Sequence, residues 1–304
     1  MALRPLRLRS YAKVNLGLEV LGRREDGYHE LRTLFQTIDL HDDVTLRPRR
    51  EGVVVRCTHP LVPTGAENLA ARAAIEMRRF AGLSEGVEIA IRKRIPVAGG
   101  LGGGSSNAAA VLLGLDRMWG LSLGPDGLHR LARRLGADVP FFLLGGTALG
   151  LGRGDEVYPL RRQLRAHVVL VDPGLPISTA RVFTRLDAGL TPRGNSNSIF
   201  YFVSRELEGP GAYRLLVNEL EAAALEEAPE LAVRSERIRS VLLGEGAQLA
   251  ALSGSGSSYF GLFDDARRAR RARSALATEG FRALAASTLT LEQYRGAIWG
   301  RLGR

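Results

Sequence analysis

The feature that most constrains this chain is a glycine-rich run at residues 99–107, Gly-Gly-Leu-Gly-Gly-Gly-Ser-Ser-Asn. An alternating apolar stretch at 87–91 precedes it, and the apolar residues 108–113 follow it directly. Glycines that accept positive φ let consecutive backbone N–H groups turn toward one anion, and a helix start adds unpaired N–H groups and a positive dipole end. The pattern predicts a strand, a phosphate-holding loop and a helix from near Ser105, with a nucleoside triphosphate as ligand. A flexible linker fits these apolar flanks poorly.

Two common phosphate loops do not fit this run. A P-loop ends in Gly-Lys-Ser/Thr, whereas Ser105 follows Gly104 here and the run contains no lysine. The dinucleotide fingerprint G-x-G-x-x-G cannot be placed on residues 99–107 in any register. The loop therefore belongs to a third kind of phosphate binder.

Length and composition indicate the number of domains and the cellular compartment. With 304 residues, 45% of them hydrophobic, it can bury a substantial core, and its length suggests two domains. Its one cysteine, Cys57, excludes an internal disulfide and favours a reducing compartment. Residues 1–10 lack the apolar core of a signal peptide, and the apolar run 139–151 is too short to cross a bilayer. The five histidines do not show the paired spacing of a zinc site. We expect a cytoplasmic protein with no membrane partner.

The net charge of +10 favours acidic partners, which include nucleotides, phosphorylated metabolites and nucleic acid. The densest basic run, 267–273, has no interleaved aromatic residues, so we interpret it as the solvated face of a helix and expect no nucleic-acid partner.

Lysine is rare in this basic chain. Of 42 Lys and Arg residues, only Lys13 and Lys93 are lysines. A compact ammonium suits a position against a phosphoryl oxygen where a planar guanidinium does not fit. The clean alternation of 11–21 predicts a half-buried strand on which Lys13 and Asn15 share a face, about 6–7 Å apart.

Other segments of the first half carry local signals. Asp26-Gly27 predicts a turn, and the adjacent rings of Tyr28 and His29 are suited to reading a base. Further predictions are a capped helix over 67–80, a helix over 125–135 that Gly136 ends, Asp138 in the following connection, and a buried strand at 141–144 after Pro140.

A second set of predicted strands and helices begins after about residue 165. We expect strands at 168–171, 249–252, 259–263 and 284–291, a helix from Ser178-Thr179, helices at 213–227 and 230–243, an Arg-rich helix, and a polar, turn-rich stretch at 191–197. This mixed order predicts two α+β domains joined near 155–165.

Several strings together resemble one family. The glycine run, preceded by Lys93-Arg94-Ile95-Pro96, resembles the phosphate loop of the GHMP kinases. The strings 12–16 (Ala-Lys-Val-Asn-Leu), 26–29 (Asp-Gly-Tyr-His) and 135–140 (Leu-Gly-Ala-Asp-Val-Pro) resemble the members whose substrate is a cytidine diphosphate-linked methylerythritol of the non-mevalonate isoprenoid pathway. Ser253-Gly254-Ser255-Gly256 resembles the family's third glycine motif, and 177–183 its substrate-side segment. Ala98 and Asn107 stand where the family often has glycine and aspartate, and Ser257-Ser258-Tyr259 replaces a more apolar run.

The resemblance implies a fold and a chemistry. The fold is α+β, with a ribosomal protein S5 domain 2-like, ATP-binding domain at 1–163 and a ferredoxin-like substrate domain at 164–304, and the active site lies between them. ATP is the co-substrate and Mg²⁺ accompanies it, with no side chain carried over as a metal ligand. The resemblance leaves open whether the protein is a monomer or a homodimer.

The resemblance also assigns roles to residues. Asp138 is the catalytic base and Lys13 its cationic partner. Asn15 and Thr179 position the erythritol portion, and Tyr28, His29 and Phe183 hold the cytosine. The expected ATP-binding residues are Asn68, Lys93, Pro96, Val97, Ala98, Gly99, Gly100, Leu101, Gly102, Gly103, Gly104, Ser105, Ser106 and Asn107.

Two alternatives remain open at this stage. The first is a GHMP kinase for homoserine or a mevalonate derivative, against which the Asp-Gly-Tyr-His string argues because such substrates lack a base. The second is an Arg-rich nucleic-acid-binding protein on a kinase fold, whose binding is strongly salt-dependent and needs no ATP.

Overall fold

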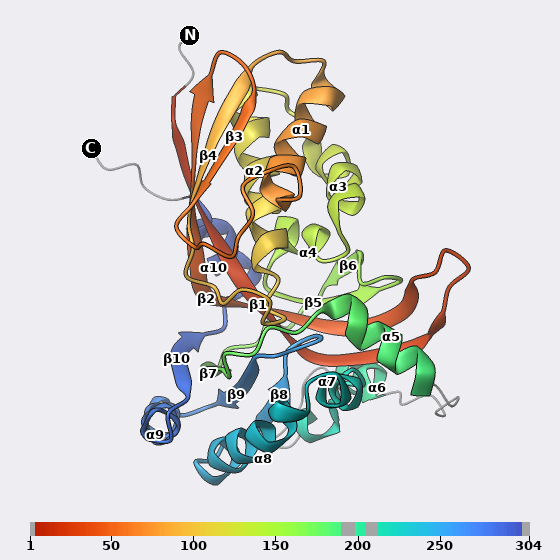
Figure 1. Ribbon diagram of the computed structural model, residues 1–304, viewed down its shortest axis with the longest axis vertical. Coiled ribbons are helices and arrows are strands. Elements are labelled where there is room, and N and C mark those ends of the chain that lie inside the picture. Colours follow the sequence, from red (N-terminus) through yellow and green to blue (C-terminus); the bar gives the residue numbers. More distant parts are fainter. Residues whose placement is uncertain (1–3, 190–197, 205–211, 300–304) are drawn as a thin grey trace.

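The computed structural model describes residues 4–189, 198–204 and 212–299. The predicted polar stretch 191–197 lies outside these residues. The described chain forms two lobes, each built on its own β-sheet (Figure 1). Within the described residues no helix is both long and apolar enough to span a membrane.

The sheet of the first lobe has six strands. Its order is β3-β4-β2-β5-β6, with β1 also paired to β2, and every pairing is antiparallel except β3 with β4. In Figure 1 the paired β1 and β2 run down the upper lobe and continue between the two lobes. The strands are β1 (Leu6–Arg23), β2 (His29–Arg49), β3 (Val53–Cys57), β4 (Gly86–Arg92), β5 (Thr147–Leu151) and β6 (Glu156–Pro159).

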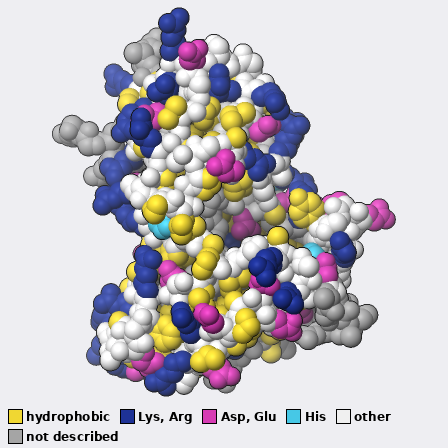
Figure 2. All heavy atoms as spheres, viewed as in Figure 1, with side chains coloured by type: hydrophobic (Ala, Val, Ile, Leu, Met, Phe, Trp, Pro, Cys, Tyr) yellow, Lys and Arg dark blue, Asp and Glu magenta, His cyan; other side chains and the backbone are white. Residues whose placement is uncertain are grey.

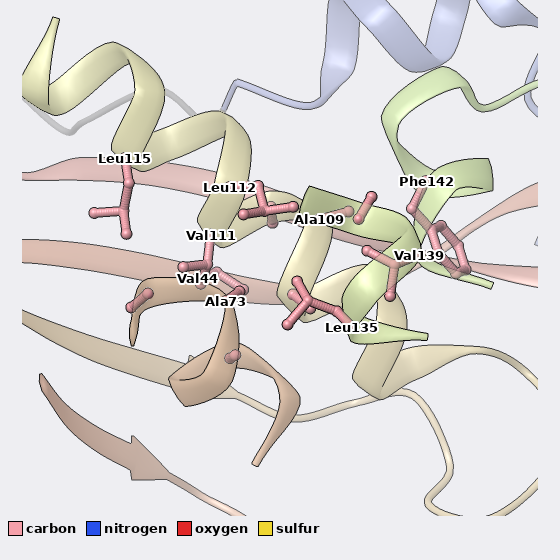
Figure 3. Close-up of a cluster of buried hydrophobic side chains, with 14 of the residues drawn as sticks. Val44, Ala73, Ala109, Val111, Leu112, Leu115, Leu135, Val139 and Phe142 are labelled. Carbon is pink, nitrogen blue, oxygen red and sulfur yellow. The ribbon is translucent and has the colours of Figure 1, made fainter. Parts of the chain in front are cut away.

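Four helices pack on this sheet, namely α1 (Leu69–Ala81), α2 (Gly103–Trp119), α3 (Gly124–Leu135) and α4 (Val139–Leu144). Their buried side chains form one core with the strands, centred on residues such as Val111 and Leu112 of α2 (Figure 3). The predicted helices over 67–80 and 125–135 are confirmed. On α1 small alanines and Met77 are buried, whereas the larger Ile75 and Phe80 are 38% and 47% exposed.

The predicted strand at 141–144 is wrong. Residues Val139–Leu144 form helix α4, with Pro140 in its first turn. Proline is tolerated there because the first N–H groups of a helix have no partner within it. An apolar run this short fits a buried helix as well as a strand. Asp138 lies in the connection as expected, immediately before α4.

The half-buried character predicted for the first strand is also wrong, because both faces of β1 are covered. Val14 and Leu16 share a core with Phe260 of the second lobe, whereas Lys13 and Asn15 are only 3% and 2% exposed. Residues 10–19 of β1 are therefore buried on both faces.

The second lobe is built on a four-stranded antiparallel sheet in the order β10-β7-β9-β8, which is ferredoxin-like. The elements are β7 (His167–Asp172), α5 (Thr179–Gly189), α6 (Ser198–Ser204), a 3₁₀ turn (Ala212–Leu215), α7 (Glu221–Glu227), α8 (Pro229–Gly244), β8 (Leu249–Leu252), β9 (Tyr259–Phe263), α9 (Ala266–Thr278) and β10 (Arg282–Ser287). The arginines of α9 are exposed while Ala269, Ala272 and Leu276 are buried, so its basic face is solvated as predicted.

Two boundaries in this lobe differ from prediction. The helix expected over 213–227 is interrupted because the chain pairs with β1: the Leu18 N–H donates to the Val217 carbonyl, and the Glu219 N–H donates to the Leu18 carbonyl. The last strand ends at Ser287, and Thr290 then caps α10 (Leu291–Ala297).

Helix α10 returns to the first lobe. The Tyr294 hydroxyl donates to the Phe142 carbonyl, and the Ile298 carbonyl accepts from the Arg9 N–H at 2.8 Å. The last strand of the first sheet ends at Pro159 and the first strand of the second sheet begins at His167, whereas the final residues of the described chain pack against the first sheet.

Candidate active site

A cavity of about 540 Å³ lies between the lobes. Its walls come from β1, the residues before and in the glycine loop, the start of α1, the β5–β6 turn and the start of α5. Figure 2 shows the molecule narrowing between the lobes. The cavity brings together most of the residues expected to bind ligands.

The glycine loop closes one side of the cavity. Gly100 and Gly102 have φ of 73° and 67°, in the left-handed region. A Cβ on Gly100 would lie 2.0 Å from the Ser253 carbonyl oxygen, and one on Gly102 would lie 2.7 Å from Phe142 Cζ. Helix α2 begins at Gly103, two residues before the expected start, and its first turn lines the cavity. The loop thus needs glycine both for its backbone and for close packing.

Ala98 also has positive φ, 56°. This conformation costs a non-glycine residue about 1–2 kcal/mol. A glycine would adopt this conformation without that cost.

Lys13 and Asp138 meet at the cavity wall. Lys13 Nζ lies 3.5 Å from Asp138 Oδ2, and the two side chains are 4% and 33% exposed. The ammonium also donates to Asn15 Oδ1, while Asn15 Nδ2 donates to Thr33 Oγ1 at 2.8 Å. The Phe35 ring lies against the lysine, with its centroid 5.6 Å from Nζ. A buried, oriented ammonium therefore stands beside a carboxylate that remains accessible from the cavity.

The second lobe reaches this pair through the turn between β8 and β9. The Asn15 N–H donates to Ser253 Oγ, which in turn donates to the Gly100 carbonyl at 3.0 Å. A Cβ on Gly254 would lie 3.3 Å from Lys13 Nζ. The Ser-Gly-Ser-Gly turn therefore links the lysine strand to the glycine loop.

Asn68 and Lys93 line the cavity, but their polar atoms already have partners. Asn68 caps α1 by accepting from the Ala70 N–H and donates to the Pro63 carbonyl. Lys93 Nζ donates to Asp42 Oδ2 and to the Ile95 carbonyl, both at 2.8 Å. Burial lowers the pKa of Lys93, although Asp42 opposes the shift.

Ser106 and Asn107 point into the protein. Ser106 Oγ accepts from Ser10 Oγ at 2.8 Å, and Asn107 Nδ2 donates to Ser10 Oγ and to Asp42 Oδ2. Ser106 does not contribute to the described cavity wall. Their side chains anchor α2 to the sheet.

The other residues expected to bind the acceptor come from the connection between β1 and β2, the start of β2 and the start of α5. Phe183 and Thr179 line the cavity, and Thr179 Oγ1 lies 2.8 Å from Ser255 Oγ. The His29 ring stacks on Phe183 with centroids 4.7 Å apart, and its Nε2 lies 2.7 Å from Asp187 Oδ1. Tyr28 is 55% exposed and stands outside the cavity wall.

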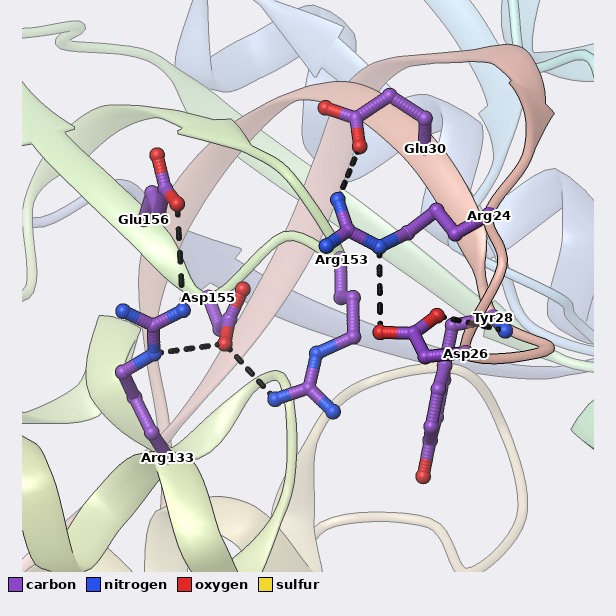
Figure 4. A network of polar contacts seen from close by, with 8 residues as sticks. All are labelled: Arg24, Asp26, Tyr28, Glu30, Arg133, Arg153, Asp155 and Glu156. Carbon is purple, nitrogen blue, oxygen red and sulfur yellow. Dashed lines mark hydrogen bonds and ion pairs between the residues drawn. The ribbon is translucent and has the colours of Figure 1, made fainter.

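Sequence reasoning missed Arg153, which lines the cavity from the β5–β6 turn. Its guanidinium carbon lies 4.7 Å from the Tyr28 ring centroid, and its Nη2 lies 2.9 Å from Asp155 Oδ2 (Figure 4). Burial opposes ionisation of Asp155, but hydrogen bonds from Arg153 and Arg133 keep the pKa of this carboxyl below its ordinary value. The only sequence signal was the Gly-Arg-Gly-Asp turn at 152–155.

Comparison with known proteins gives the family. Residues 68–146 match the GHMP kinases N terminal domain, and residues 211–283 match the GHMP kinases C terminal family. The chain is 39% identical to 4-diphosphocytidyl-2-C-methyl-D-erythritol kinase of Syntrophus aciditrophicus, over 90% of this chain and 96% of the relative. It is 43% identical to the kinase of the same name from Moorella thermoacetica, over 89% and 94%. The chain belongs to the 4-diphosphocytidyl-2-C-methyl-D-erythritol kinase family.

Solved structures agree with this family and with its fold. A crystal structure of 4-(cytidine 5'-diphospho)-2C-methyl-D-erythritol kinase is 39% identical, has a TM-score of 0.75, and aligns over 93% of this chain and 99% of its own. A homoserine kinase from Cytophaga hutchinsonii has the same TM-score at 18% identity, over 95% and 96%, which shows the shared fold alone. The expected two-part α+β GHMP kinase fold is confirmed.

Gly102→Ala should raise the KM for ATP by about tenfold, because a methyl group at this positive φ meets Phe142 and Lys13. Steady-state kinetics at varied ATP measure the effect. Gly52→Ala is the matched control: Gly52 has φ of 74° but open space around it, so this variant should keep the KM of the unmodified protein. An unchanged KM in Gly102→Ala would show that the geometry of the loop is not needed for ATP.

Proposed function

We propose that this chain transfers the γ-phosphoryl group of ATP to the 2-hydroxyl of 4-diphosphocytidyl-2-C-methyl-D-erythritol, giving the 2-phosphate and ADP. The observation that carries the proposal is the Lys13–Asp138 pair, 3.5 Å apart beside the glycine loop in a chain of this kinase family. We further propose domains at 1–163 and 164–304, a cytoplasmic location, and small-molecule partners without nucleic acid or membrane, in a monomer or homodimer.

The transfer step assigns one task to each of the paired residues. Asp138 accepts the proton of the acceptor hydroxyl, whose oxygen forms a bond to the γ-phosphorus as the bond to the β–γ bridging oxygen breaks and ADP leaves. The Lys13 ammonium stabilises the negative charge on the transferring group. Asn15 holds that ammonium in place by accepting a hydrogen bond from it at Oδ1.

Mg²⁺ supplies charge neutralisation on the phosphates when it is bound with ATP. It prefers oxygen donors, and the Asp138 carboxylate and the Ser105 hydroxyl are such donors on residues that line the cavity beside the loop. Among the described residues no cluster of three or more His, Cys, Asp or Glu side chains is arranged to hold a metal. We therefore propose that the nucleotide itself supplies most of the ligands.

The acceptor occupies the other end of the cavity. Tyr28, His29 and Phe183 hold the cytosine by stacking and hydrogen bonding, and Asn15 and Thr179 position the erythritol portion. The Asp187 carboxylate fixes the orientation of the His29 ring. Asn68, Lys93 and residues 96–107 form the ATP site. Within this set, Lys93, Ser106 and Asn107 act indirectly, by holding the glycine loop in shape.

A coupled assay for ADP release tests the proposal. The cytidine-bearing substrate should support turnover, whereas homoserine and mevalonate should not. Turnover with either of these two acceptors alone would favour the alternative GHMP kinase activities. Salt-sensitive nucleic-acid binding without any turnover would favour the binding protein.

Asp138→Asn should lower kcat by about 10²–10⁴-fold with substrate binding largely kept, because the amide cannot accept the proton. Lys13→Arg should also lower kcat strongly, since Phe35 and Gly254 enclose the ammonium and leave no room for a planar fork. Steady-state kinetics on each variant give the result. Full activity of Lys13→Arg would remove the lysine from the mechanism.

We infer that the Arg153 guanidinium, which lines the cavity beside the Tyr28 ring, binds the diphosphate of the acceptor. Arg153→Gln should therefore raise the KM for the cytidine-bearing substrate at least about tenfold and leave the KM for ATP unchanged. Arg133→Gln is the matched control. Arg133 also pairs with Asp155 but does not line the cavity, so this variant should keep both constants. Equal effects of the two variants would assign Arg153 a purely structural role.

A further inference from the structure

A second cavity, of about 380 Å³, lies on the first lobe and shares no lining residue with the candidate active site. Its walls come from β1 and β2, from Arg94 just after β4, and from the end of α10 with Trp299 just beyond it. The proposed kinase chemistry uses none of these residues.

The cavity is strongly basic. Arg7 Nη2 and Arg94 Nη2 approach the same atom, Asp43 Oδ2, at 3.2 and 2.8 Å. A third guanidinium, that of Arg9, lies on the strand position opposite Asp43 and shares a side-chain hydrogen bond with Tyr11. Arg7 and Arg94 thus share the Asp43 carboxylate, and among the described lining residues three guanidinium groups stand against this one carboxylate.

The strand pattern produces this arrangement. Along β1, Leu8 is buried in the core, so Arg7 and Arg9 both project to the other face of the sheet, about 6–7 Å apart. The C-terminal segment walls the same face, since the Arg9 N–H bonds the Ile298 carbonyl and Leu8 pairs with Trp299. Folding therefore holds like charges in one place, which is unfavourable until an anion joins them.

We propose that this cavity is a binding site for the phosphate or diphosphate group of a small polar metabolite. Guanidinium groups match phosphoryl oxygens in geometry and charge, and the Arg7 and Arg94 side chains are 42% and 37% exposed, so a ligand from solvent reaches them. Polar side chains dominate the walls, which excludes a large apolar ligand.

Trp299 provides a direct readout because this residue lines the cavity. Inorganic pyrophosphate should change the Trp299 fluorescence saturably, with inorganic phosphate binding more weakly. The titration uses the full chain with saturating ADP, which keeps pyrophosphate out of the glycine loop. Trp299→Phe should abolish the fluorescence change while calorimetry still detects binding.

Arg9→Gln and Arg7→Gln should each weaken pyrophosphate binding at least about tenfold, because each removes a charged donor. Both variants should keep the kcat of the unmodified protein, and their thermal midpoints should be no lower, because each substitution removes one of several like charges. Arg94 is left intact, because it stands between Lys93 and Ile95 in the segment that leads into the glycine loop, and a change there would mix effects on the two cavities. Arg237→Gln is the matched control, since Arg237 lies on α8 and pairs with Glu279.

Three results overturn the proposal. One is the absence of binding heat in the unmodified protein, and another is retention of full affinity in both Arg9→Gln and Arg7→Gln. The third is an equal response to sodium chloride at matched ionic strength, which indicates screening alone. None of these readouts requires turnover, so failure here leaves the proposed kinase activity untouched, and failure of that activity leaves this site untouched.

Discussion

The geometry of the phosphate side depends on one buried carboxylate, Asp42. It is 0% exposed and accepts hydrogen bonds from Lys93 Nζ, Asn107 Nδ2 and the N–H groups of Arg94 and Ile95. A buried charge is tolerated only when it is paired and fully bonded, and removing one partner of such a pair typically costs about 3–5 kcal/mol. Asp42 thereby joins β2, the segment that leads into the glycine loop, and the first turn of α2. The loop is consequently held in shape before any nucleotide arrives, which lowers the entropy lost on binding.

Much of this could be predicted from sequence where the cause is local. Three predictions rest on residues that are neighbours in the sequence: the glycine loop, the helix that Gly136 ends and the turn before Tyr28. The structure confirms all three. Helix α4 was missed because a short apolar run after a proline satisfies two local solutions, and only packing decides between them. The faces of β1 were misjudged because burial by the second lobe is a long-range property.

The site shows the same division between local and long-range causes. The rarity of lysine pointed to Lys13 and Lys93, yet it could not distinguish their surroundings. Lys13 meets Asp138, which lies 125 positions later in the sequence, whereas Lys93 meets Asp42. The role of Arg153 had no sequence signal beyond the glycine turn that also holds Asp155, because Tyr28 comes next to Arg153 only through the strands of the first sheet.

The neighbouring carboxylates of β2 explain why the lysine and arginine positions are not interchangeable. Successive strand residues point to opposite faces, so Asp42 faces the interior and Asp43 faces the arginines. In the interior, Lys93 fits as a compact ammonium that bonds a carboxylate oxygen and a carbonyl together. On the opposite face, Asp43 is itself only 7% exposed and receives two guanidinium groups that remain partly solvated. Lys93 and Arg94 thus hydrogen-bond to both carboxylates. These bonds fix the short segment that connects the basic cavity with the glycine loop.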